Sequence, residues 1–147
     1  MLDARLALAL SALCTLTACK SSDSEKLEGL LDTYAEERTA VRDLLCTCPS
    51  ALGYATSNEC ESGIGEIDGM GKQCIVDAFD GQESLGEDYF DCVLPLQDQY
   101  RDCLNAALTC GDDWFVPCED AYDGNVLDTC PTLPTDVAMD YANCLPG

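Results

Sequence analysis

The chain contains no histidine among its 147 residues. Histidine is the general base of Ser–His–Asp and Cys–His hydrolases and a common ligand of zinc, so these types of site are excluded. The two-histidine helix motif of zinc metalloproteases is excluded for the same reason. A pair of carboxylates could act on a glycoside, but no pair stands out among so many acids. We therefore predict that the protein has no catalytic site and is not an enzyme.

Basic residues are also scarce, with 7 Lys and Arg against 28 Asp and Glu, which gives a formal net charge of -21. Nucleic acids and anionic lipid surfaces are bound mainly through Lys and Arg that contact phosphates. Because a chain this acidic is repelled by them, we predict no nucleic-acid partner. The apolar fraction of 47% is nevertheless too high for a disordered acidic tail and predicts a packed domain.

The apolar segment at the N-terminus, Leu6 to Leu16, is too short to span a bilayer. It follows a single base, Arg5, and precedes small residues. A base, a short apolar segment and small residues in this order are typical of an export signal. The sequence therefore predicts that residues 1–18 are a signal peptide, which is removed from the mature protein.

Residues 16–19, Leu-Thr-Ala-Cys, resemble the lipobox of bacterial lipoproteins. In that family the signal is cut before the cysteine, whose thiol receives a diacylglycerol and whose amino group is then acylated. The resemblance implies that Cys19 is the lipid-attachment site and that residues 19–25 tether the domain to a membrane. Lys20 follows, and inner-membrane retention in some Gram-negative bacteria calls for Asp there, so the resemblance implies delivery to the outer membrane or cell surface. The alternatives are an ordinary secretory signal and a buried N-terminal helix.

Cysteine, in contrast, is abundant, with 12 in the chain. Loss of Cys14 with the signal and acylation of Cys19 leave an even set of ten. Because exported thiols oxidise, we predict that all ten form disulfides. These ten are Cys46, Cys48, Cys60, Cys74, Cys92, Cys103, Cys110, Cys118, Cys130 and Cys144. A single C-x-C pair does not make a thiolate cluster, and no calcium-loop pattern is complete, so we predict no metal and no cofactor.

Apolar residues recur at helical spacing from Leu27 to Leu45 and again from Leu85 to Ala107. Ser84 and Glu87 have the spacing of a capping box and would open the second of these helices. A shorter helix is predicted over residues 72–79. Two more are predicted, one from Pro117 to near Cys130 and one from Pro134 to near Cys144. No stretch alternates as a strand would. The sequence therefore predicts an all-α, disulfide-rich bundle of helices and helical hairpins over residues 26–147.

Two hypotheses address how the cysteines pair. Spacings of 12 and 14 residues occur at Cys48, Cys60 and Cys74, and again at Cys118, Cys130 and Cys144. This repeat suggests duplicated halves, residues 26–80 and 83–147, with equivalent bridges within each half. The other hypothesis folds the chain about a turn near Gly81, so that Cys74 bridges Cys92 and Cys60 bridges Cys103. The sequence does not choose between them.

Two aromatic residues, Trp114 and Phe115, lie between Cys110 and Cys118. A bridge between those cysteines would place the two rings at the tip of a loop, as a contact patch. Burial is the commoner fate of such residues, so we expect them in the core.

These features together predict a membrane-anchored, disulfide-stabilised acidic lipoprotein. We expect it to act as a non-catalytic structural or interaction module of the bacterial cell envelope, with an unknown protein partner. The alternative is a carrier of a small hydrophobic ligand or lipid, because several small disulfide-bonded helical folds, such as saposins and elicitins, hold lipids between their helices.

Mass spectrometry of the protein extracted from its native membrane tests the N-terminal prediction. We expect a thioether-linked lipid on Cys19 and no peptide from residues 1–18, because cleavage before Cys19 removes them. Cys19→Ser should abolish the lipid and release the protein from the membrane fraction. Recovery of an unmodified Cys19 joined to residue 18 would contradict the prediction.

Overall fold

A computed structural model describes residues 22–146 and is all-helical over that range, as predicted. The elements in chain order are α1 (Ser22–Leu45), the short 3₁₀ helix η1 (Pro49–Leu52), α2 (Ser57–Ile64), α3 (Gly69–Ala78), α4 (Glu83–Ala107), α5 (Val116–Thr129) and α6 (Thr135–Cys144). The predicted signal peptide and Cys19 lie outside the described residues. Residues 22–25, assigned to the tether from the sequence, are helical, and the spacing of Ser22 and Glu25 is also that of a capping box at a helix start.

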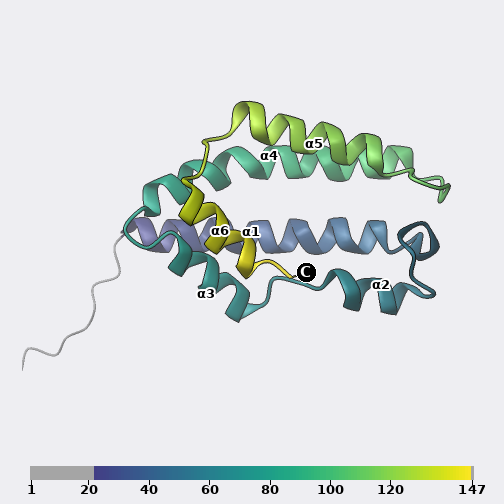
Figure 1. Cartoon of the computed structure of the whole chain (residues 1–147), viewed down its shortest axis with the longest axis horizontal. Coiled ribbons are helices and arrows are strands. Elements are labelled where there is room, and N and C mark those ends of the chain that lie inside the picture. Colours follow the sequence, from purple (N-terminus) through teal and green to yellow (C-terminus); the bar gives the residue numbers. More distant parts are fainter. Residues whose placement is uncertain (1–21, 147) are drawn as a thin grey trace, which may run out of the picture.

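The two long helices, α1 and α4, lie side by side and run in the same direction (Figure 1). An ion pair of 2.6 Å joins Lys26 Nζ to Glu87 Oε2 near the start of both helices. A second ion pair, Arg101 with Glu37, joins them further along. Parallel neighbours need a crossover connection, and α2 and α3 supply it by returning along α1 (Figure 1). The chain then returns along α4 through α5.

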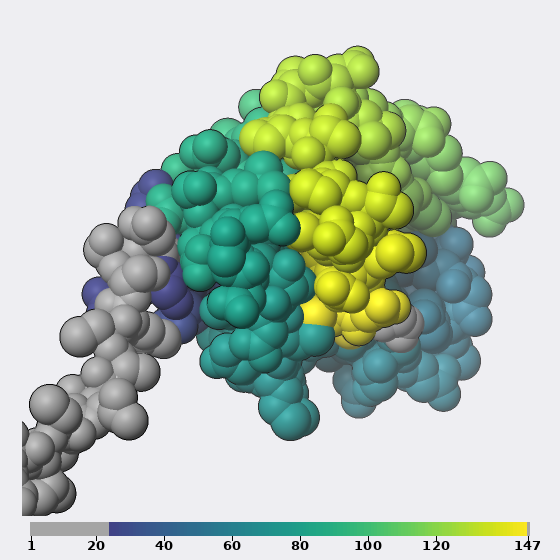
Figure 2. All heavy atoms as spheres, turned by 60° about the vertical axis from the view of Figure 1, so that its left-hand side comes forward, coloured from purple at the N-terminus to yellow at the C-terminus, as the bar shows by residue number. Residues whose placement is uncertain are grey.

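The C-terminal helix α6 closes the fold by packing against α3. In Figure 2 the yellow C-terminal segment lies between the teal segment around α3 and the lime segment of α5. A disulfide between Cys74 of α3 and Cys144 of α6 fixes this contact. The last helix therefore belongs to the same packed body as the first half of the chain.

Phe90 of α4 lies at the centre of the main core and is fully buried. Its ring makes edge-to-face contacts with Tyr34 at 5.1 Å, Phe79 at 5.9 Å and Tyr141 at 5.9 Å between centroids. These rings come from α1, the end of α3 and α6, so one side chain joins four helices. Such pairs add about 0.5–1.5 kcal/mol each beyond the area they bury.

A second, smaller apolar cluster lies at the far end of the long helices, around Leu104 and Val41. Trp114 belongs to it with 7% of its surface exposed, and Phe115 packs against it. The expectation of a core position is therefore confirmed for Trp114, whereas Phe115 is only partly buried. The loop that carries them is joined to the end of α1 by the disulfide between Cys48 and Cys110.

All ten cysteines predicted to pair do so. The bridges are Cys46–Cys60, Cys48–Cys110, Cys74–Cys144, Cys92–Cys130 and Cys103–Cys118. The hairpin hypothesis is wrong, because Cys74 bonds Cys144 instead of Cys92, and Cys60 bonds Cys46 instead of Cys103. The physical reason is that α4 packs against α1 and α5, whereas α3 packs against α1 and α6.

The expectation of equivalent bridges within duplicated halves is also wrong. Cys74 and Cys144 occupy the same position in the proposed repeat, yet they bond to each other. Cys48 and Cys110 also join the two segments. The halves resemble each other only in outline, each with one long helix followed by two shorter ones; in the second half α5 returns along α4, whereas α6 packs against α3 (Figure 1).

The capping residues differ from those predicted. Ser84 lies inside α4, whose N-cap is Gln82, and no side chain caps that end. The capping box belongs to α2 instead, which the sequence analysis did not identify. Thr56 Oγ1 accepts a hydrogen bond from Glu59 N at 3.2 Å, and Glu59 Oε2 accepts one from Ala55 N at 3.1 Å.

Replacement of Gly86 by Ala tests the close approach of α4 to the core. A Cβ at Gly86 would lie 3.0 Å from two ring atoms of Phe79 and 3.1 Å from Leu27 Cδ1, so we expect a loss of about 1–3 kcal/mol from overpacking. The control is Gly29→Ala in α1, where a Cβ meets nothing within 4 Å. That change should increase stability by about 0.5–1 kcal/mol through helix propensity. Denaturant unfolding of both variants measures the difference, and equal effects would contradict this description of the core.

Candidate functional site

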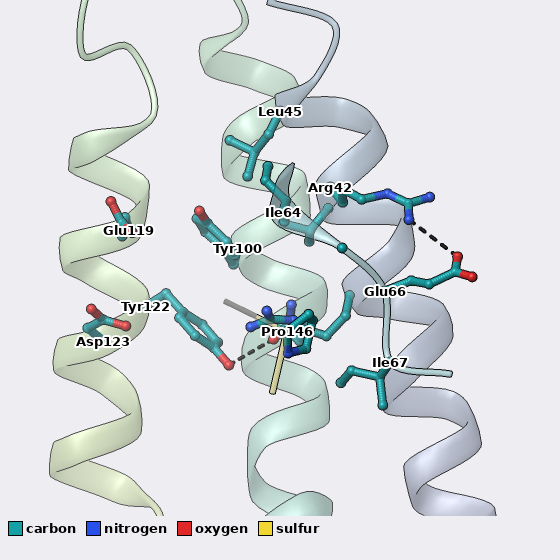
Figure 3. A pocket seen from close by; sticks show the side chains of 14 residues that line it. Arg42, Leu45, Ile64, Glu66, Ile67, Tyr100, Glu119, Tyr122, Asp123 and Pro146 are labelled. Carbon is teal, nitrogen blue, oxygen red and sulfur yellow. Dashed lines mark hydrogen bonds and ion pairs between the residues drawn. The ribbon is translucent and has the colours of Figure 1, made fainter. Parts of the chain in front are cut away.

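A cavity of about 220 Å³ lies between α1, α4, α5 and the segment that joins α2 to α3 (Figure 3). Part of its wall is apolar. Val41 and Leu45 contribute from α1, Ile64 and Ile67 from the two ends of the joining segment, and Pro146 from the C-terminal segment. A site lined in this way can bury the apolar part of a small molecule.

The C-terminal segment closes against the α2–α3 connection at Gly65. The φ angle of Gly65 is +74°, which favours glycine, and a Cβ there would lie 2.7 Å from Pro146 Cβ. The absence of a side chain at Gly65 therefore allows Pro146 to seat beside the cavity. The Cys74–Cys144 bridge holds the chain two residues before this proline.

Two arginines of α1, Arg38 and Arg42, also line the cavity. Arg42 is neutralised by Asp43, at 2.8 Å, and by Glu66 of the joining segment, at 3.3 Å (Figure 3). The hydrogen bond to Asp43 is the main cause of a raised pKa at Arg42, so that group stays charged. Within residues 22–146, Arg38 forms neither an ion pair nor a side-chain hydrogen bond, although it is half-buried.

The floor of the cavity is aromatic and polar. Tyr122 of α5 donates a hydrogen bond of 2.8 Å to Oε1 of Gln97 on α4 (Figure 3). Gln97 is only 2% exposed, so this bond holds a polar group deep between the helices. Tyr100 and Tyr122 stack with their centroids 5.1 Å apart. The two stacked rings thus join α4 and α5 beside the cavity.

Two acidic residues, Glu119 and Asp123, complete the wall on the α5 side, one helical turn apart. Both are exposed, and within the described chain neither carboxylate has an ion pair. The pKa of Tyr100 is raised to about 12, mainly by burial and in smaller part by the charges of Glu119 and Asp123, while the charge of Arg38 acts to lower it. Charges of both signs therefore act on Tyr100, which lines the cavity.

This arrangement suits binding better than proton transfer. Burial also raises the pKa of Tyr122, so both phenols that line the cavity stay neutral near pH 7. A neutral phenol and an amide can donate and accept hydrogen bonds, but neither is a base at that pH. Across residues 22–146, no group of three or more potential metal ligands comes together. The lining offers apolar contact, hydrogen bonds and fixed charges.

The residues singled out in the sequence do not form this site. None of the ten cysteines lines the cavity; they hold the helices around it. Arg38 and Gln97 were missed, although each interrupts an apolar face at helical spacing. Arg38 lies four residues after Tyr34 and three before Val41, and Gln97 lies four after Val93. A polar residue within such a stripe is the signal that could have identified them.

Comparison with known proteins found no family model, no curated protein and no solved structure that matches the chain. In the part of the chain that the structure describes, no helix combines the length and apolar character needed to cross a membrane. Five disulfides are consistent with an exported protein.

The raised pKa of Tyr100 gives a test of the charges around the cavity. Glu119→Gln combined with Asp123→Asn should lower that pKa, because both carboxylates disfavour the phenolate. Ultraviolet titration of phenolate, with Tyr100→Phe to assign the signal, measures it. Asp120→Asn, also an exposed acid of α5, is the control and should leave it unchanged.

The same shift predicts how stability depends on pH. The folded-state pKa of Tyr100 lies above its ordinary value of 10.0, so the folded state disfavours loss of the proton. Its contribution to stability is complete below pH 10 and is lost as the pH rises through about 12. Tyr89, whose pKa burial also raises to about 12, acts in the same direction. Unchanged denaturation midpoints between pH 9 and pH 12 would contradict these assignments.

Proposed function

We propose that the protein is an exported, lipid-anchored and non-catalytic binding module of the bacterial cell envelope that carries a small ligand in the cavity described above. The lipobox-like residues 16–19 support the anchor, and the five disulfides support export. The observation that carries the binding role is the cavity itself, where apolar walls meet a buried amide and a charge without a partner.

A catalytic role has little support from the lining. The tyrosines are neutral at physiological pH, and Arg42 is engaged by two carboxylates. An enzyme needs a nucleophile or base whose pKa is matched to the reaction. The unpaired acids Glu119 and Asp123 are exposed, and exposed acids are weak candidates for such tuning.

The size of the cavity favours a small ligand over a lipid. A volume of about 220 Å³ lies below the roughly 300–1,000 Å³ of pockets that hold drug-sized ligands. A lipid with two acyl chains is larger than such ligands. Of the carrier roles considered from the sequence, the small ligand is therefore the one that the geometry supports.

A role as an interaction module for a protein partner is the second candidate, and the surface charge favours it. Residues 22–146 contain 27 acids, which is 28 in the chain less Asp3, and 5 bases, which is 7 less Arg5 and Lys20. Four of those bases are already paired with carboxylates. Such a surface repels anionic partners and attracts a basic protein.

Filling the cavity separates these two roles. Ile64→Trp places a large ring in the lining, while Leu127→Trp, at a residue 81% exposed on α5 and outside the cavity, is the matched control. Native mass spectrometry of protein extracted from its membrane, and calorimetry with n-hexanol, should show a bound ligand in the wild type and in Leu127→Trp. Ile64→Trp should lose it. Equal behaviour of all three proteins would remove the carrier role and leave the interaction module.

A further inference from the structure

The cavity places one unpaired positive charge and two unpaired negative charges around a single apolar space. Arg38 contributes from α1, and Glu119 and Asp123 contribute from α5. The charges of all three reach Tyr100, which lines the cavity between them. In Figure 3, Glu119 and Asp123 project from α5, and the rings of Tyr100 and Tyr122 lie between α5 and α4.

The lack of a partner for Arg38 is unusual in this chain. Of the five bases among residues 22–146, Lys26, Arg42, Lys72 and Arg101 are each paired with at least one carboxylate. A half-buried guanidinium has lost part of its hydration and gains most from a carboxylate that meets it with two parallel hydrogen bonds. Although acids are in such excess, Arg38 stays unpaired among residues 22–146, and it lies in the lining of the cavity beside the paired Arg42.

A ligand with a net negative charge does not fit the rest of the site. The chain carries a formal charge of -21, and Glu119 and Asp123 lie in the same wall, so an anion is repelled on approach. A simple cation is attracted by those carboxylates but leaves Arg38 unpaired. A zwitterion has no net charge and supplies both missing partners.

The aromatic face supports the same assignment. The stacked rings of Tyr100 and Tyr122 adjoin the acidic wall. An ammonium group is stabilised both by carboxylates and by the face of a tyrosine ring. Val41 and Leu45, on the turns of α1 that follow Arg38, offer apolar contact for the carbon atoms between the two charged groups.

We propose that the cavity binds a small zwitterion, with its carboxylate on Arg38 and its ammonium group at Glu119, Asp123 and the two tyrosine rings. The cavity volume of about 220 Å³ is below that of pockets for drug-sized ligands, which favours compact amino acids and betaines. This inference rests on the proposed carrier function and names the chemistry of its ligand.

Calorimetry of the purified, oxidised protein with three matched probe series tests the proposal. The first series is unbranched ω-amino acids of increasing length, and the others are the length-matched alkyl carboxylates and alkylammonium ions. At least one ω-amino acid should bind at least about tenfold more tightly than both of its singly charged analogues, because only the ω-amino acid can pair with Arg38 and with the two carboxylates at once.

Two variants and two controls assign the groups. In Arg38→Met the affinity for the ω-amino acid should fall to within about threefold of the affinity for the alkylammonium ion. In Glu119→Gln with Asp123→Asn it should fall to within about threefold of the affinity for the alkyl carboxylate. Lys72→Met and Asp120→Asn remove the same charges outside the cavity and should leave binding unchanged.

The outcomes separate the ligand class from the carrier role. If n-hexanol binds the wild type and not Ile64→Trp, while no ω-amino acid exceeds its singly charged analogues, the zwitterion assignment is overturned and the carrier role stands. If neither n-hexanol nor any of the three series binds, both proposals fail. Tight binding of an ω-amino acid that Arg38→Met leaves unchanged also overturns the assignment, because the carboxylate is then held elsewhere.

Discussion

The parallel contact between α1 and α4 is the constraint on which the rest of the structure depends. Phe90 anchors it at one end by joining four helices, and the Arg101–Glu37 ion pair lies toward the other. Two parallel helices cannot be joined by a tight turn, so α2 and α3 must carry the chain from the end of α1 back to the start of α4. That crossover places Ile64 to Ile67 opposite α5, and the cavity forms where this segment meets α1, α4 and α5.

The cavity exists because the apolar faces of three helices are interrupted at the same level. Arg38 and Gln97 are polar, and Tyr122 packs against the main cluster but carries a hydroxyl group that needs a partner. The turns on either side of them supply apolar side chains to the two core clusters. Side chains that carry charge or need hydrogen bonds cannot interdigitate as Leu and Phe do, so space remains. The break between the two clusters therefore leaves polar groups around an open space.

The disulfides allow so acidic a chain to hold this shape. Net charge far from zero opposes compaction, and a domain of this size has a modest core. Each bridge contributes typically about 2–4 kcal/mol, mostly by restricting the unfolded chain. Two of the five, Cys48–Cys110 and Cys74–Cys144, join segments 62 and 70 residues apart and hold the first three helices to the last three. The bridges surround the cavity without entering it.

The sequence by itself determined the oxidised state and every α-helix except α2, because helical periodicity and cysteine content are local or compositional properties. The apolar stripe from Leu27 to Leu45 and the start of α5 beside Pro117 were predictable in this way. Only the tertiary structure decided that Cys74 meets Cys144 and that Arg38, Tyr100 and Asp123 line one cavity. These pairings depend on which helices are neighbours, and regular spacing fits several arrangements equally well. The direction of α4 relative to α1 selects one of them, and that direction is set by packing over the whole chain.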